Sequence, residues 1–193
     1  EITYGDWSSD VCSSDLIDDE YLRERATDVR DVTKLAFEFL ILTAARTGEV
    51  IHADWQEFDF AAKTWTVPKE RMKAGVEHVV PLSGRTLEIL RDLETITGGE
   101  DFVFPARSSD KPISNMAFLM MLRRMKLEIT AHGFRSTFRD WASERTNFAS
   151  EVVEMALAHT ITNKVEAAYR RGNLLDKRRD LMEAWASFVA AKP

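Results

Sequence analysis

The sequence predicts a mainly helical α+β fold that contains a small three-stranded antiparallel sheet. Most of the chain divides into segments with apolar faces and cap residues at their ends, as in helices. One short region is different, because three runs rich in β-branched and aromatic residues follow one another there. The chain has 193 residues, 45% of them hydrophobic and 30% charged, which suffices to bury the core of such a fold.

The first helix is expected to begin at Asp31, a good N-cap residue, and to end near Gly48, which suits a helix terminus. Its surface is mostly apolar, so we expect this helix to be central. A short helix over Glu49–Ala53 follows. Pro81 marks the last of three strands as an edge strand or a strand end. The strands are expected at Trp55–Phe60, Thr64–Val67 and His78–Leu82.

Helices account for the rest of the fold. The final helix carries a broad apolar stripe, which either docks on the protein's own core or contacts a partner. The stripe consists of Leu181, Met182, Trp185, Phe188 and Val189. The helices are expected at Gly84–Thr97, Ser114–Met125, Gly133–Arg145, Ser150–Ala158, Thr162–Arg171 and Leu175–Ala190.

The beginning of the chain fits neither helix nor strand. Ser-Ser-Asp occurs twice within residues 1–16, which resemble translated sequencing-adapter sequence, and a disordered polar terminus is the alternative. We therefore treat 1–16 as a non-native or disordered leader and expect one domain over 17–193. Because the chain does not begin with methionine, we expect it to be the later part of a longer protein, with upstream domains missing.

Composition excludes several classes of protein. The single Cys12 cannot form an internal disulfide, which fits a reducing compartment. No signal peptide is visible, and the apolar stretch Leu35–Ala45 is too short to span a bilayer. We therefore expect a cytoplasmic protein with no membrane partner.

The net charge of -6 argues against binding to nucleic acid, but the charge is uneven along the chain. Residues 1–60 carry ten more acidic than basic side chains, whereas residues 123–180 carry four more basic than acidic ones. Affinity for phosphates depends on the local potential more than on the total. The basic half therefore stays compatible with an anionic partner.

Arg46 and Lys73 are the first two candidate functional residues. Arg46 stands where the first buried helix ends, so it needs Glu49 as a structural partner, or else an anion with Glu49 orienting the guanidinium. Lys73 lies in a cationic loop between the second and third strands, with Lys69 as its competitor. Such a loop is either a phosphate contact or a solvated turn.

The stretch His132–Arg135 begins a helix and is the strongest local pattern. At helical spacing, His132, Arg135 and Arg139 share one face, which presents a histidine and an arginine near the N-terminus, where anions are favoured. A separate aromatic face is expected to pack into the core. It consists of Phe134, Phe138 and Trp141. The alternative is an ordinary surface helix.

His159 follows an apolar helix, and Tyr169 comes ten residues later. Taken alone, a capping histidine and a packing tyrosine are the ordinary interpretations. Tyr4 lies in the leader and Tyr21 in an acidic segment, so Tyr169 is the remaining candidate nucleophile. Cations that hold a phosphate, groups that move protons and a phenol that becomes the covalent carrier together suit cleavage of a phosphodiester.

No cofactor is implied by the sequence. We interpret His52 as partly buried structure and His78 as a strand residue, and their spacing does not suit metal ligands. There is no Gly-rich phosphate-binding loop and no paired-carboxylate arrangement of the metal-nuclease type. We therefore expect neither ATP nor a divalent metal.

The stretches that carry the candidate residues resemble those of the tyrosine recombinases in their order, spacing and local sequence. They resemble in particular the integrases of prophages and genomic islands. The resemblance covers roughly residues 17–193 and departs from the usual wording at a few positions. Ala44-Ala45 replaces Thr-Gly, Phe134 stands where Leu is commoner, and Ala158 replaces Gly. The implied catalytic set is Arg46, Lys73, His132, Arg135, His159 and Tyr169.

The resemblance implies the catalytic-domain fold of this family and a bacterial, nucleoid-associated enzyme of DNA integration and excision. Tyr169 would form a 3′-phosphotyrosyl bond, Lys73 would protonate the leaving 5′ oxygen, and His132 would serve as acid–base group. The partner would be double-stranded DNA, bound by a homotetramer that the C-terminal helix joins. A type IB topoisomerase and a non-catalytic DNA-binding remnant of a decayed prophage are the alternatives.

Overall fold

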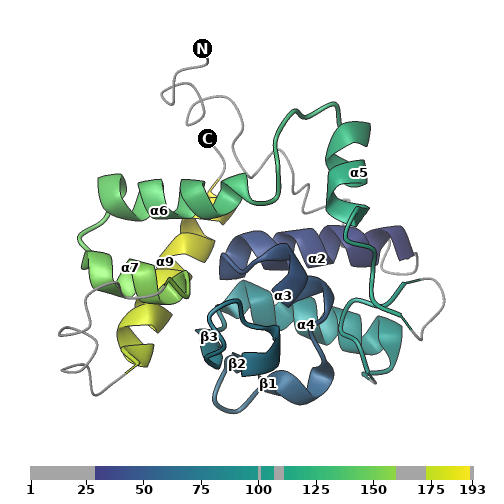
Figure 1. Cartoon of the computed structure of the whole chain (residues 1–193), viewed down its shortest axis with the longest axis horizontal. Helices are drawn as coiled ribbons and strands as arrows, with labels where there is room; N and C mark the ends of the chain where they lie inside the picture. The colour runs from purple at the N-terminus through teal and green to yellow at the C-terminus, as the bar shows by residue number, and fades with distance from the viewer. Residues whose placement is uncertain (1–28, 100, 107–110, 160–172, 192–193) are drawn as a thin grey trace.

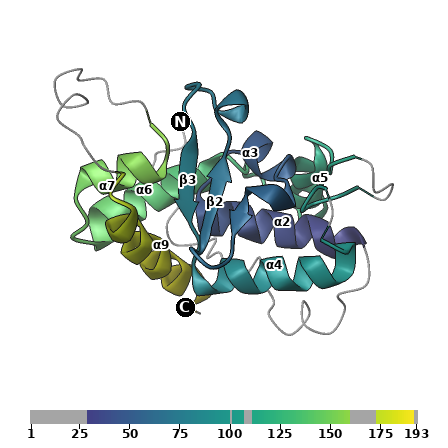
Figure 2. The ribbon, with the colours of Figure 1, turned by 90° about the horizontal axis from the view of Figure 1, so that it is seen from below.

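A computed structural model describes residues 29–99, 101–106, 111–159 and 173–191. Within these residues, the fold combines helices with a three-stranded antiparallel sheet whose strand order is β1-β2-β3. Figures 1 and 2 show α6, α7 and α9 gathered on one side of the molecule, with α2, α4 and α5 on the other side. The predicted fold class is therefore confirmed.

Helix α2 (Val29–Thr43) is the central element, as predicted, and it packs against α4, α5 and α9. Its residues Phe39, Leu40 and Ile41 are almost completely buried. The helix ends before the predicted terminus, because Ala44 adopts a left-handed conformation with φ of 49°. The Thr43 hydroxyl also donates to Phe39 O at 2.7 Å, so this carbonyl near the helix end has a local hydrogen-bond partner.

The sheet consists of β1 (Phe58–Asp59), β2 (Thr64–Val67) and β3 (His78–Pro81). The prediction of a first strand over Trp55–Phe60 is wrong in its first half, where Trp55–Glu57 forms the 3-10 helix η2. The Asp54 carboxylate causes this difference, since it accepts a hydrogen bond from Gln56 N at 2.9 Å. Pro81 ends the edge strand β3, as predicted.

The remaining helices follow the predicted pattern. The helices α4, α6 and α9 have the predicted bounds, whereas α5 and α7 are shorter than expected. The predicted helix Thr162–Arg171 lies outside the described residues. The observed bounds are Gly84–Thr97 for α4, Ala117–Arg124 for α5, Gly133–Arg145 for α6, Ser150–Ala156 for α7 and Leu175–Ala190 for α9. No described helix has the length and apolar character needed to cross a membrane.

The apolar stripe of α9 docks on the protein's own core. Leu181, Met182 and Val189 are buried. Trp185 is also buried, where its ring lies 5.0 Å from that of Trp141 and its Nε1 donates to Ile41 O at 2.8 Å. Of the two alternatives for this stripe, the structure therefore supports packing within the chain.

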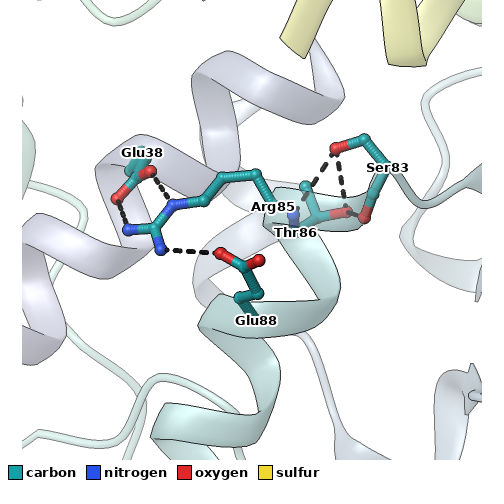
Figure 3. A network of polar contacts seen from close by, with 5 residues as sticks. All are labelled: Glu38, Ser83, Arg85, Thr86 and Glu88. Carbon is teal, nitrogen blue, oxygen red and sulfur yellow. Dashed lines mark hydrogen bonds and ion pairs between the residues drawn. The ribbon is translucent and has the colours of Figure 1, made fainter. Parts of the chain in front are cut away.

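A cluster of charged side chains joins α2 to α4 (Figure 3). Arg85 of α4 pairs with the buried Glu38 of α2 at 2.7 Å and with Glu88 at 3.2 Å. Beside it, Ser83 caps α4 by accepting a hydrogen bond from Thr86 N. This cluster supports the core and serves below as a reference for the charged residues of the candidate site.

Candidate active site

Arg46 is held at the N-terminus of the short helix α3 (Thr47–Ile51). Its Nη1 lies 2.8 Å from Glu49 Oε1, and its backbone N donates to Glu49 Oε2, also at 2.8 Å. The Glu49 side chain is only 5% exposed, whereas that of Arg46 is 28% exposed. Glu49 thus orients the guanidinium and leaves part of it open to solvent, which combines both predicted roles of this carboxylate.

An open pocket of about 610 Å³ lies beside Arg46, between α3 and the connection from β2 to β3. It brings Arg46 together with Lys73, which is exposed. The competitor Lys69 is not part of the lining and lies 3.9 Å from Glu70. The lining residues are Arg46, Gly48, Glu49, His52, Glu70, Arg71, Met72 and Lys73.

Arg135 is buried, with 6% of its surface exposed, and lies within electrostatic range of Arg46. It donates to Ala44 O, two residues before Arg46, and to Leu157 O at 2.7 Å. Burial, and then the charge of Arg46, lower the pKa of Arg135 to about 10, while Glu49 opposes the shift. Arg135 therefore remains charged at neutral pH, and this buried cation lies close to the guanidinium of Arg46.

His132 is exposed at the start of α6, and Arg135 follows it on the first turn. Arg139, which helical spacing places on the same face, is exposed and pairs with Glu154 of α7 at 2.9 Å, whereas Arg135 is buried. The aromatic face is confirmed. Phe138 and Trp141 are buried, and the ring of Phe134 packs edge-on against that of Phe37 at 5.4 Å.

His159 is oriented by Glu154, whose Oε2 lies 2.6 Å from His159 Nδ1. The preceding Ala158 has φ of 50°, a left-handed conformation that favours glycine. This geometry accounts for the usual Gly at that position in the family that the sequence resembles. Because Leu157 O accepts from Arg135, the stretch that carries His159 is attached to the buried arginine.

Tyr169, the predicted nucleophile, lies outside the described residues. The residues on either side of 160–172 both contact β3. His78 Nε2 donates to Ala156 O at 3.3 Å, and the buried Arg178 donates to Val79 O at 2.7 Å and to Asn173 O at 2.9 Å. Burial, and then the charge of Arg178, lower the pKa of His78 to about 4, so His78 is neutral at physiological pH.

Two pocket residues were missed by the sequence-based interpretation. His52 is exposed in the pocket, and the prediction that it is partly buried is wrong. Arg71 lines the same pocket and pairs with Glu57, a partner fourteen residues away that spacing could not reveal. In the described part of the chain, no group of three His, Cys, Asp or Glu side chains could hold a metal ion.

The structure defines a mainly helical domain in which cations gather beside an open pocket, and comparison with known proteins identifies its family. The Phage integrase family matches residues 20–174, so the chain belongs to this family. The chain is 36% identical over 170 residues to prophage integrase IntA of Escherichia coli K12, which covers 86% of the chain and 41% of IntA. Prophage integrase IntZ of the same strain is 38% identical over 168 residues, with coverage of 86% and 41%.

Solved structures show the same fold at low sequence identity. The integrase from mycobacterium phage Brujita matches with a TM-score of 0.64 and 18% identity, over 94% of this chain and 63% of that chain. A lambda integrase (75–356) dimer bound to a COC′ core site matches with a TM-score of 0.56 and 19% identity, over 84% and 59%. The predicted family and fold are thus confirmed. The chain spans about two fifths of the length of the curated relatives that it matches.

Proposed function

We propose that this protein is a tyrosine site-specific recombinase, which breaks and rejoins double-stranded DNA during integration or excision of a mobile element. The observation that carries the proposal is the convergence of cations from distant stretches of the chain. Arg46 and Lys73 line one pocket, and the buried Arg135 lies within electrostatic range of Arg46. Membership of the phage integrase family supports the same activity.

The scissile phosphate is held by Arg46, Arg135 and His159 in this proposal. A pentacoordinate phosphorane carries more negative charge than the diester, so preorganised cations favour the transition state over the ground state. Burial lowers the pKa of Arg135, which means that its charge is poorly solvated in the free protein. An anion at this site relieves that cost, and Glu154 keeps His159 oriented for the same task.

Tyr169 is the proposed nucleophile. A free tyrosine has a pKa of about 10, so only about one in a thousand is ionised at neutral pH, and ionising it costs roughly 4 kcal/mol. Nearby cations lower that cost. The phenolic oxygen attacks phosphorus and forms a 3′-phosphotyrosyl bond, Lys73 gives its proton to the departing 5′ oxygen, and His132 acts as acid–base group. The 5′ hydroxyl of a partner strand reverses the step, which conserves the bond energy.

Double-stranded DNA is the proposed partner. Two structural neighbours were solved with DNA, namely the lambda integrase dimer and the Tn1549 transposon integrase, which matches with a TM-score of 0.55. Assembly of four copies on DNA stays a prediction. Since the apolar stripe of α9 packs inside its own chain, such an assembly needs contacts other than this stripe.

A nicked suicide substrate tests the proposal, because the fragment released by cleavage diffuses away and traps the covalent adduct. We expect the unsubstituted protein to form a tyrosine-linked adduct and Tyr169→Phe to form none while it still binds the same DNA. An adduct formed by Tyr169→Phe would exclude Tyr169 as nucleophile. Binding without any adduct would support the non-catalytic remnant, and relaxation of supercoils without strand exchange would support the topoisomerase.

A further inference from the structure

We infer that Arg71 is a positioning residue, which holds the connection between β2 and β3, and with it Lys73, against the Arg46 side of the pocket. The inference deepens the proposed function and rests on it. It starts from a difference between neighbouring cations of the loop. Lys69 and Lys73 are exposed, whereas Arg71 is turned inward and its side chain is 21% exposed.

The Arg71 guanidinium joins two other parts of the chain. Its Nη1 donates to Glu49 O in α3 at 2.8 Å, and its Nη2 pairs with Glu57 Oε2 in η2. The Glu57 carboxylate, whose side chain is 13% exposed, also accepts from Trp65 Nε1 of β2 at 2.9 Å. One planar fork thus fixes the loop to α3 and, through Glu57, to the sheet.

These contacts bear on Lys73 because only Met72 separates the two residues, and Met72 is buried. The backbone between them is further constrained, since Arg71 N donates to Pro68 O and Gly75 N donates to Met72 O. A lysine carries its charge on a flexible stem, so the position of its backbone decides which phosphate oxygen it reaches. Anchoring Arg71 and Met72 therefore sets the position of Lys73 on the pocket wall.

The same contacts also set Lys73 relative to Arg46. Glu49 accepts from Arg71 through its backbone carbonyl and binds Arg46 through its carboxylate. Glu49 of α3 therefore binds Arg46 directly and fixes the position of Lys73 through Arg71. Both terminal nitrogens of Arg71 are engaged, and its charge is balanced by the Glu57 carboxylate, whereas Arg135 donates only to neutral carbonyls. Arg71 therefore acts through Lys73 and not as a phosphate ligand.

The experiment compares cleavage of two suicide substrates by the full chain and its Arg71→Lys and Arg71→Met variants. In the second substrate, sulfur replaces the leaving 5′ oxygen. A thiolate leaves without a proton, because thiols have a pKa of about 8.5, so this substrate does not need Lys73. We expect both variants to lose about 10- to 100-fold in adduct rate on the oxygen substrate, the scale that misplacement of a catalytic group costs. On the sulfur substrate we expect rates near that of the unsubstituted protein.

Arg85→Met is the matched control. Arg85 is as exposed as Arg71 (23% of the side chain) and pairs with the buried Glu38, but it does not line the pocket (Figure 3). We expect it to lower thermal stability in the way that Arg71→Met does, without a difference between the two substrates. Hydrogen exchange gives a readout that does not depend on activity. The amides of residues 69–77 should exchange faster in the Arg71 variants and not in Arg85→Met.

Three results would overturn the inference. Equal loss on both substrates would make Arg71 a general structural residue. A parallel loss of DNA affinity and cleavage would make it a phosphate ligand, and unchanged exchange over 69–77 would show that it does not hold the loop. Failure of the proposed function is a separate result, because the unsubstituted protein would then form no adduct on either substrate.

Discussion

Two clusters each pair a half-buried arginine with a buried carboxylate, but their uses are opposite. The α2–α4 cluster consists of Glu38, Arg85 and Glu88, and the pocket cluster consists of Arg46, Glu49, Glu57 and Arg71. In the α2–α4 cluster, Arg85 pairs with two carboxylates, and these ion pairs join the two helices. In the pocket cluster, charges are balanced in pairs, Lys73 lines the same pocket, and the buried Arg135 lies within electrostatic range of Arg46.

The comparison teaches that an ion pair becomes part of a binding site through what surrounds it. A buried or half-buried pair contributes little net stability, since desolvation offsets much of the attraction. The surroundings of the pair decide whether the carboxylate only neutralises the arginine or holds it in an orientation in which it can bind a ligand. Glu49 leaves 28% of the Arg46 side chain exposed toward a cationic pocket, which is the arrangement that an anionic substrate requires.

The largest effect is expected from Arg135→Ala. If Arg135 holds the phosphate as proposed, removing this preorganised donor should lower the adduct rate by about 1,000-fold. It should also lower the free energy of unfolding by about 3 kcal/mol, because Ala44 O and Leu157 O lose their buried partner. Adduct assays and urea unfolding measure the two effects. Arg85→Ala should reproduce the loss of stability alone, and an equal loss of cleavage in Arg85→Ala would remove the distinction between the clusters.

Acid should destabilise the folded protein through His78 of β3. Its pKa is lowered to about 4 in the folded protein, against 6.5 for the ordinary group, and its charged neighbours are Arg178, Glu49 and Arg135. The unfolded chain therefore takes up the proton first. Stability is fully present above pH 6.5 and is lost as the pH falls toward 4, by on the order of 3 kcal/mol.

Urea unfolding at several pH values tests this prediction. His78→Gln cannot titrate, so the slope of the unfolding free energy between pH 6.5 and 4 should become shallower in that variant. An unchanged slope would mean that other groups cause the acid sensitivity.

A smaller effect on cleavage is expected from Glu49→Gln. The amide keeps the shape of the carboxylate but loses the charge that holds Arg46, so the adduct rate should fall about 10-fold. Glu38→Gln makes the same change in the α2–α4 cluster and should leave the rate unchanged. A rate loss in both variants would indicate that the carboxylates act only through the stability of the fold.

The smallest effect is expected from Ala44→Gly. Ala44 has φ of 49°, which costs a residue with a side chain roughly 1 kcal/mol relative to glycine. The substitution should raise the thermal midpoint by a few degrees without changing cleavage, because it leaves the Ala44 carbonyl that Arg135 contacts in place. A lower adduct rate at constant DNA affinity would show that the turn before Arg46 must be rigid.

Local features of the sequence suffice where neighbouring residues decide the structure. Ser83 caps α4 and Gly98 ends it with φ of 83°, so both bounds follow from short-range chemistry. The predicted aromatic face of α6 is likewise buried, because its period matches the helix. The first predicted strand is wrong only in its first half, because a side-chain cap at Asp54 outweighs the β propensity of Trp55.

Contacts between residues that are distant in the sequence could not be predicted from such local features. The pairing of Arg71 with Glu57 and Glu49, the burial of Arg135 between two carbonyls and the exposure of His52 depend on which elements meet in space. Tyr169 stays a prediction, since it lies outside the described residues.

Residue types, order and spacing were enough to predict the family, the mainly helical α+β fold and the candidate chemistry. Each of these depends on local patterns within segments of about ten to twenty residues. The tertiary structure decided which cations line the same pocket and which are neutralised by carboxylates elsewhere. It also showed that the stripe of α9 is core. The physical reason is that burial and electrostatic potential sum over neighbours in space, and those neighbours are up to 144 positions apart in this chain.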